Sequence, residues 1–237
     1  MKTVVYLHGG GVTPEDYQGL IDSLSKRYKV IAPNLYELAE TKRFTWKEFA
    51  GNLDKSLGGK KVYLVGTSLG ADLTLAYAAF YPQKVKAVVV CEPVGKMKRS
   101  VIGWAYVLQK TTIRALFYPG GFRAIMRPRF NFLRECLLNF RKIYSLTRMV
   151  RKEDYERFLV KIKAPVYLLW SKNSGLLPLW VGKRLHQRIP NSTINPNFSD
   201  KNHLWCFLEQ ERIAQEVKKI FDDISTRGER WEKISNF

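Results

Sequence analysis

The sequence contains few cysteines, which limits the disulfide bonds and metal sites that it can form. Its 3 cysteines, Cys91, Cys136 and Cys206, are far apart and odd in number. A disulfide framework needs paired cysteines, so we expect a reducing, cytoplasmic location. No Cys/His cluster has the spacing of zinc ligands, and the glycine motifs of nucleotide-binding loops are missing. The sequence therefore predicts neither a metal nor a cofactor.

Long apolar runs are missing as well. The longest uncharged apolar stretch, Val101–Leu108, is far shorter than the ~20 residues of a membrane-spanning helix. The N-terminal run, Thr3–Leu7, is too short for a signal peptide and is typical of a strand. We therefore expect a protein that is soluble or peripheral on a membrane surface.

Acidic residues are outnumbered by basic ones. The chain has 21 Asp and Glu against 40 Lys and Arg, which gives a net charge of +19. This excess indicates an acidic partner, such as an anionic membrane surface, a phosphorylated substrate or nucleic acid. The length of 237 residues suits one domain with an inserted subdomain.

Short β-branched runs alternate with amphipathic segments along most of the chain. Strands are predicted at Thr3–Leu7, Lys29–Ala32, Val62–Val65, Val85–Cys91, Val166–Trp170 and Asn191–Pro196. Helices are predicted at Pro14–Arg27, Trp46–Leu57, Ala71–Tyr81, Leu179–Arg188 and Glu209–Ile224, and fraying from Ser225 to Phe237. The pattern predicts an α/β fold with a mostly parallel sheet of about six strands and helices on both faces.

Residues 94–163 interrupt the alternation and carry 17 Lys/Arg against 4 Asp/Glu. Helices are predicted there at Leu133–Val150 and Glu153–Ile162, with turns at Tyr118–Gly121 and Arg127–Pro128. We therefore divide the chain into a core of residues 1–93 and 164–237 and a basic helical insertion of residues 94–163.

The segment Gly66-Thr67-Ser68-Leu69-Gly70 lies between a predicted strand and a predicted helix. In that setting a G-x-S-x-G turn presents the serine hydroxyl at the helix N-terminus. The Leu69 amide is then directed toward an oxyanion formed on the substrate. We predict that Ser68 is a nucleophile.

The first predicted strand ends in His8-Gly9-Gly10-Gly11. Glycine lets the backbone approach a substrate closely, so this loop can supply a second oxyanion-hole amide, which we assign to Gly10. A plain strand-to-helix loop is the simpler interpretation of the same residues.

His203 follows the last predicted strand and is the predicted general base. The order Ser…acid…His along the chain is the one this kind of serine site uses. The other two histidines are less well placed, because His8 belongs to the glycine loop and His186 lies in a helix among basic residues.

Together these three segments resemble the α/β-hydrolase superfamily. The resemblance covers residues 3 to about 224, and the insertion falls where that family places its cap. The chain begins at what would be the family's third strand. The resemblance implies hydrolysis of an ester, thioester, amide or lactone without a cofactor, and does not choose among them.

The triad acid departs from the family pattern. The segment Trp170–Pro178 resembles W-G-x-x-D-x-x-x-P, but Ser174 occupies the aspartate position. Three interpretations remain open: Glu92, after the preceding strand, is the acid; Asn173 or Ser174 orients the histidine; or the triad is broken. Asp200 is a fourth, weaker candidate.

The basic insertion also has several interpretations. In the first, its arginines are solvated while its aromatic residues pack on the core. In the second, the arginines and aromatic residues together meet an anionic lipid layer. In the third, the arginines steer a phosphate-bearing acyl donor. Nucleic acid is not expected, because no nucleic-acid motif is present.

We therefore predict a serine hydrolase that cleaves an ester or thioester of an apolar acyl group through an acyl-enzyme. The alternative is an impaired hydrolase-fold protein that binds an anionic membrane or an acidic partner through residues 94–163. The oligomeric state is not indicated by the sequence.

Overall fold

A computed structural model describes residues 1–39, 45–97, 113 and 121–235. Its centre is one six-stranded, fully parallel sheet with the strand order β2-β1-β3-β4-β5-β6. The strands are β1 (Thr3–Leu7), β2 (Lys29–Ile31), β3 (Val62–Thr67), β4 (Val85–Cys91), β5 (Val166–Ser171) and β6 (Ser192–Ser199).

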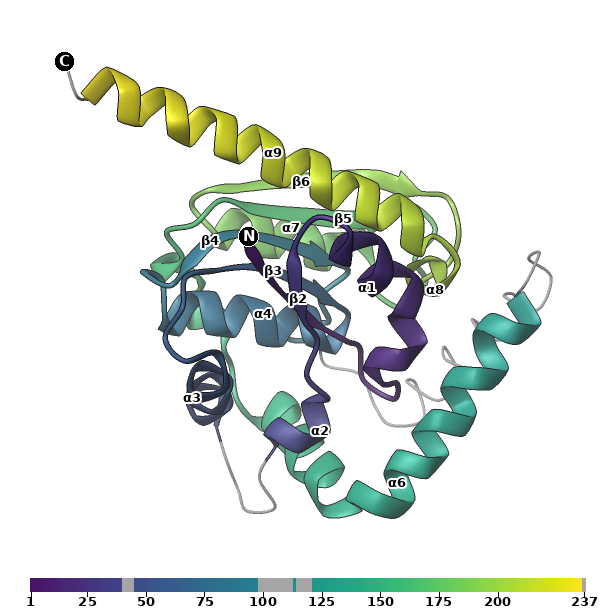
Figure 1. Cartoon of the computed structure of the whole chain (residues 1–237). Helices are drawn as coiled ribbons and strands as arrows, with labels where there is room; N and C mark the ends of the chain where they lie inside the picture. Colours follow the sequence, from purple (N-terminus) through teal and green to yellow (C-terminus); the bar gives the residue numbers. More distant parts are fainter. Residues whose placement is uncertain (40–44, 98–112, 114–120, 236–237) are drawn as a thin grey trace.

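Helices cover both faces of this sheet (Figure 1). The core on one face is formed with α3 (Trp46–Leu57), α4 (Leu69–Phe80) and α7 (Leu179–Arg188). The core on the other face is formed with α1 (Gln18–Ser25) and α9 (Gln210–Ser235). The remaining elements are η1 (Pro14–Tyr17), α2 (Leu35–Leu38), α6 (Gly121–Lys152), η2 (Glu156–Lys161) and α8 (Trp205–Leu208).

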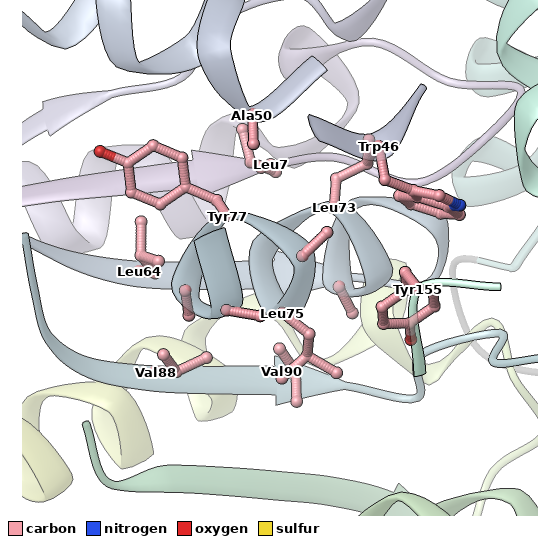
Figure 2. Close-up of a cluster of buried hydrophobic side chains, with 14 of the residues drawn as sticks. Leu7, Trp46, Ala50, Leu64, Leu73, Leu75, Tyr77, Val88, Val90 and Tyr155 are labelled. Carbon is pink, nitrogen blue, oxygen red and sulfur yellow. The ribbon is translucent and has the colours of Figure 1, made fainter. Parts of the chain in front are cut away.

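Helix α4 is the most deeply buried of these helices. Figure 2 shows Leu73, Leu75 and Tyr77 packed among side chains of neighbouring strands and of α3, and all three are fully buried. Burying one such leucine stabilises the fold by roughly 1.5–3 kcal/mol relative to leaving it in water. Because α4 follows β3 after a single residue, this packing also fixes the position of Ser68.

Local signals set the ends of α3. The Thr45 hydroxyl accepts a hydrogen bond from the Glu48 amide (3.2 Å), and the Glu48 carboxylate accepts one from the Thr45 amide (2.7 Å). This reciprocal capping satisfies two of the amides that a helix start leaves unpaired. Gly58 ends the helix with a φ of 60°, a left-handed conformation that favours glycine.

The α/β prediction is confirmed, and the predicted bounds of β1, β4, α3 and α7 match the structure. The turn at Arg127–Pro128 is wrong, because α6 runs through Pro128 and changes direction later, at Asn139. The predicted end of the last helix at Ile224 is also wrong: α9 continues to Ser235. That segment is rich in Glu, Lys and Arg, which favour helix even without an apolar face.

Most of the described residues of the insertion lie in α6 and η2. The predicted turn at Tyr118–Gly121 lies largely outside the described residues. None of the described helices is long and apolar enough to cross a membrane. All three cysteines are free thiols; Cys91 and Cys206 are buried, while Cys136, on α6, is partly exposed.

Candidate active site

Ser68 occupies a tight turn between β3 and α4. Its backbone has φ 53° and ψ −122°, a conformation that residues with a side chain rarely adopt. Glycine is required beside it: a Cβ on Gly70 would lie 2.1 Å from the carbonyl oxygen of Leu7. The sequence G-x-S-x-G therefore folds into a strained turn that leads into the N-terminus of α4, as the strand-turn-helix order predicts.

The glycine loop after β1 lies against this turn. A Cβ on Gly9 would be 3.4 Å from the Cβ of Ser68, and one on Gly10 would be 3.2 Å from a methyl group of Leu69. Leu69 is the first residue of α4, so its amide has no acceptor within the helix. The Gly11 amide, in contrast, donates to the Tyr36 hydroxyl (2.9 Å).

His8 holds the glycine loop in place and is fully buried. The Leu35 amide donates to its Nε2 (3.0 Å), so Nδ1 carries the proton and donates to the Gly9 carbonyl (2.8 Å). Burial lowers the pKa of His8 to about 4, because the charged imidazolium would be desolvated. His8 is therefore a neutral structural residue at physiological pH.

Glu92 follows β4, the strand next to Ser68. The Ser68 amide donates to the carbonyl of Cys91 (2.9 Å), which places Glu92 directly beside the serine turn. Glu92 is fully buried and has a φ of 46°, a strained conformation for a residue with a side chain.

The Glu92 carboxylate contacts His203. His203 Nδ1 is hydrogen-bonded to Glu92 Oε2, and Ser174 Oγ donates to the same oxygen (2.9 Å). The Ser171 amide donates to Glu92 Oε1 (2.8 Å). A buried carboxylate is thus held by three donors from two different loops.

The other candidates lie differently. Ser174 contacts Glu92, while Asn173 Nδ2 donates to the Asp200 carbonyl. Asp200 itself is exposed. His186 pairs with Ser192 Oγ (2.8 Å), between α7 and β6. The structure therefore brings Glu92, Ser174 and His203 together.

Asp72, on the first turn of α4, binds the start of the insertion. Its carboxylate accepts hydrogen bonds from the amides of Val94 and Gly95 (both 2.8 Å) and from the Tyr155 hydroxyl. Burial raises the pKa of Asp72 to about 7, although these hydrogen bonds favour the charged form. The two ends of the insertion are thus joined through one buried carboxylate.

The sequence analysis missed Asp72, the Ser171 amide and Tyr36. Asp72 had a detectable signal, because it is the only charged residue in the sequence of α4. The roles of the Ser171 amide and Tyr36 depend on which loops meet, so no local pattern indicates them. In the described part of the chain, no three His, Cys, Asp or Glu residues are grouped to hold a metal ion.

Comparisons with known proteins agree with this architecture. A sequence model of the alpha/beta hydrolase fold matches residues 2–149. An uncharacterized hydrolase, YugF, of Bacillus subtilis is 23% identical over 91% of this chain and 88% of its own length. A 2-hydroxy-6-oxononadienedioate/2-hydroxy-6-oxononatrienedioate hydrolase of Paraburkholderia phymatum is 30% identical over 70% of this chain, which spans 63% of that relative.

Among solved structures, a hydrolase from Oleispira antarctica superposes with a TM-score of 0.75 at 15% identity. The superposition covers 94% of this chain and 91% of that one. The two proteins therefore share the fold. With the family match over most of the chain, this shows that the protein belongs to the α/β-hydrolase family.

Proposed function

We propose that the protein is a serine hydrolase that cleaves an ester or thioester of an apolar acyl group through an acyl-enzyme. Ser68 is the nucleophile, His203 the general base and Glu92 the acid of the triad. The observation that carries the proposal is the hydrogen bond between the buried Glu92 carboxylate and His203 Nδ1, beside the strained turn of Ser68.

In the proposed first half-reaction, Ser68 Oγ attacks the substrate carbonyl carbon and its proton passes to His203 Nε2. The Gly10 and Leu69 amides donate to the oxyanion of the tetrahedral intermediate. The bond to the leaving group then breaks, and the leaving group takes the proton from His203. The acyl group is now esterified to Ser68.

The second half-reaction regenerates the serine. Water gives a proton to His203 and attacks the acyl carbon; the intermediate collapses, and Ser68 Oγ recovers the proton as the acid leaves. Throughout, Glu92 holds the imidazole with Nδ1 protonated and stabilises the imidazolium that forms twice per turnover.

Several features support Glu92 in this role in place of an acid at position 174. A glutamate is one methylene longer than aspartate, and Glu92 starts from the strand between those of Ser68 and Ser174. The Ser171 amide donates a hydrogen bond to the other Glu92 oxygen, Oε1, and this contact fixes the plane of the carboxylate. The acyl group is proposed to be apolar because residues 94–163, the proposed cap, are rich in aromatic and aliphatic side chains.

The test is labelling of the full chain with a fluorophosphonate probe, followed by turnover of p-nitrophenyl esters of increasing chain length. We expect labelling of the wild type and none of Ser68→Ala or His203→Ala. Folded wild-type protein that does not label would contradict an activated serine and favour the impaired, binding protein. The dienedioate substrate named for the 30%-identical relative is a second substrate to assay beside the esters.

The identity of the acid has its own test. Glu92→Gln should lower kcat by about 10⁴, the penalty that follows loss of the acid in a serine protease, whereas Asp200→Asn, the matched control, should turn over normally. Adding Ser174→Asp to Glu92→Gln places a carboxylate beside the same imidazole and should restore part of the rate. Normal turnover by Glu92→Gln would remove Glu92 from the mechanism.

A further inference from the structure

The N-terminal half of α6, up to Asn139, presents large apolar side chains to the solvent. Its exposed side chains include Phe130 (70% exposed) and Leu137 (79% exposed). Among its described side chains, two polar ones face the protein: Asn131 Nδ2 donates to Asp16 of η1 (2.7 Å), and Glu135 is only 3% exposed. A helix that only packs on a protein core has the opposite arrangement.

The exposed apolar side chains form one line along the helix. We call Met126, Phe130, Leu133 and Leu137 the outer stripe; all four are exposed. Their spacings of four, three and four residues place them on one face of an α-helix. Exposed apolar residues scattered singly are common on proteins, but an aligned row of large ones marks an interaction surface.

The stripe is bordered by positive charge. Residues 121–152 contain nine Lys and Arg and one acidic residue, Glu135. Arg127 and Arg134 are exposed beside the stripe, and Arg141 is exposed just beyond Asn139. Arg134 also pairs with the buried Glu135 (3.3 Å).

We propose that the outer stripe docks α6 on an anionic phospholipid surface. Its apolar side chains would enter the boundary between headgroups and acyl chains, while the neighbouring arginines contact phosphate and carboxylate headgroups. A second copy of this chain fits the stripe poorly, because each copy would bring the same exposed arginines, Arg127, Arg134 and Arg141, to the interface. Nucleic acid would match the arginines and leave the apolar row exposed.

The location of α6 in the fold suits this docking. Figure 1 shows its N-terminal half extending away from the sheet. Helix α6 packs against α2, which carries the Leu35 amide that binds His8, and against α8, which begins two residues after His203. A bilayer on the stripe would thus lie on the side of the molecule that carries both loops.

The experiment is flotation of the full chain with phosphatidylcholine vesicles, with and without phosphatidylserine. We expect binding to the phosphatidylserine vesicles and at least tenfold weaker binding to the neutral ones. Leu133→Ser/Leu137→Ser should lose at least tenfold in vesicle affinity, and Arg127→Gln/Arg141→Gln should bind more weakly and with less dependence on salt. Turnover of a short, soluble ester by these variants should remain that of the wild type.

Val160→Ser is the matched control, because Val160 is an exposed apolar residue of η2, outside the stripe. It should bind vesicles as the wild type does. Unchanged binding of Leu133→Ser/Leu137→Ser, or no binding of the wild type to phosphatidylserine vesicles, would overturn the proposal. So would a wild-type dimer that the same double substitution converts to a monomer, since the stripe would then join two copies.

Discussion

Helices α4 and α6 use the same kinds of apolar residues in opposite ways. In α4, the alanines and the leucines after Leu69 are buried around a single buried carboxylate, Asp72. In the N-terminal half of α6, the leucines and Phe130 face outward, and Asn131 and Glu135 face the protein. An apolar side chain stabilises a fold only when folding removes it from water. The apolar residues of α4 therefore stabilise the fold around the serine turn, whereas those of the outer stripe remain in contact with water.

The largest expected effect is on the free energy of unfolding, and the same Leu→Ala substitution should affect it very differently in the two helices. Leu73→Ala in α4 should lower the free energy of unfolding by about 2–5 kcal/mol, because it opens a cavity in the core. Leu137→Ala in α6 should change it by no more than about 0.5 kcal/mol, since its side chain is already in water. Denaturant titration followed by circular dichroism measures both. Equal losses would break the comparison, because the stripe would then belong to the folding core.

A second difference concerns pH. The folded-state pKa of Asp72 is raised from 3.8 to about 7, so the folded protein retains a proton that the unfolded chain releases. The contribution of protonated Asp72 to the free energy of unfolding is fully present below pH 4 and is lost as pH rises to 7. This contribution is on the order of 4 kcal/mol at most. Asp72→Asn should remove this dependence, whereas Arg141→Gln on α6, a control at an exposed charge, should not.

The titration of His8 changes stability with pH in the opposite direction, so its contribution must be measured separately from that of Asp72. Its pKa is lowered from 6.5 to about 4, so the unfolded chain binds a proton that the folded protein excludes. Its contribution is present above pH 6.5 and is lost as pH falls toward 4. The measurement is therefore the difference in unfolding free energy between wild type and Asp72→Asn at each pH, in which the His8 contribution cancels. A difference that does not change between pH 4 and 7 would contradict the burial effect on Asp72.

The smallest expected effect lies beside the serine turn. Ser174 donates to the Glu92 oxygen that contacts His203. A hydrogen bond to a charged group contributes ~1.5 kcal/mol, so Ser174→Ala should lower kcat about tenfold. Ser174→Thr, which keeps the hydroxyl, should recover the rate, and Leu137→Ala should leave it unchanged. A loss from Ser174→Ala as large as that from Glu92→Gln would instead make Ser174 itself indispensable to the histidine.

The sheet and the serine turn were predictable because their signals are local. Thr3–Leu7 and Val85–Cys91 are short apolar runs, and Gly66–Gly70 contains its own turn chemistry. The contact between Glu92 and His203 was only one alternative among several. It depends on how the ends of β4, β5 and β6 line up, and residues 111 positions apart carry no joint pattern.

The orientation of α6 illustrates a different limit. An apolar stripe in a sequence shows that a helix has two faces, and does not show which face meets the protein. Here the inward face was selected by Asn131 and its partner Asp16, a contact across 115 residues. Pro128 was misleading in another way: an Arg-Pro pair is typical of a turn, yet α6 continues through it.

The distribution of the three thiols gives α6 a built-in attachment point. Cys91 and Cys206 are fully buried, and burial raises the pKa of both thiols, so alkylating reagents should react with them slowly. Cys136 is partly exposed on α6, adjacent in sequence to Leu137 of the outer stripe. A maleimide dye should therefore attach at one position of the unaltered protein. The emission of the dye would then report how strongly that helix is exposed to water in a given environment, and no engineered cysteine is needed.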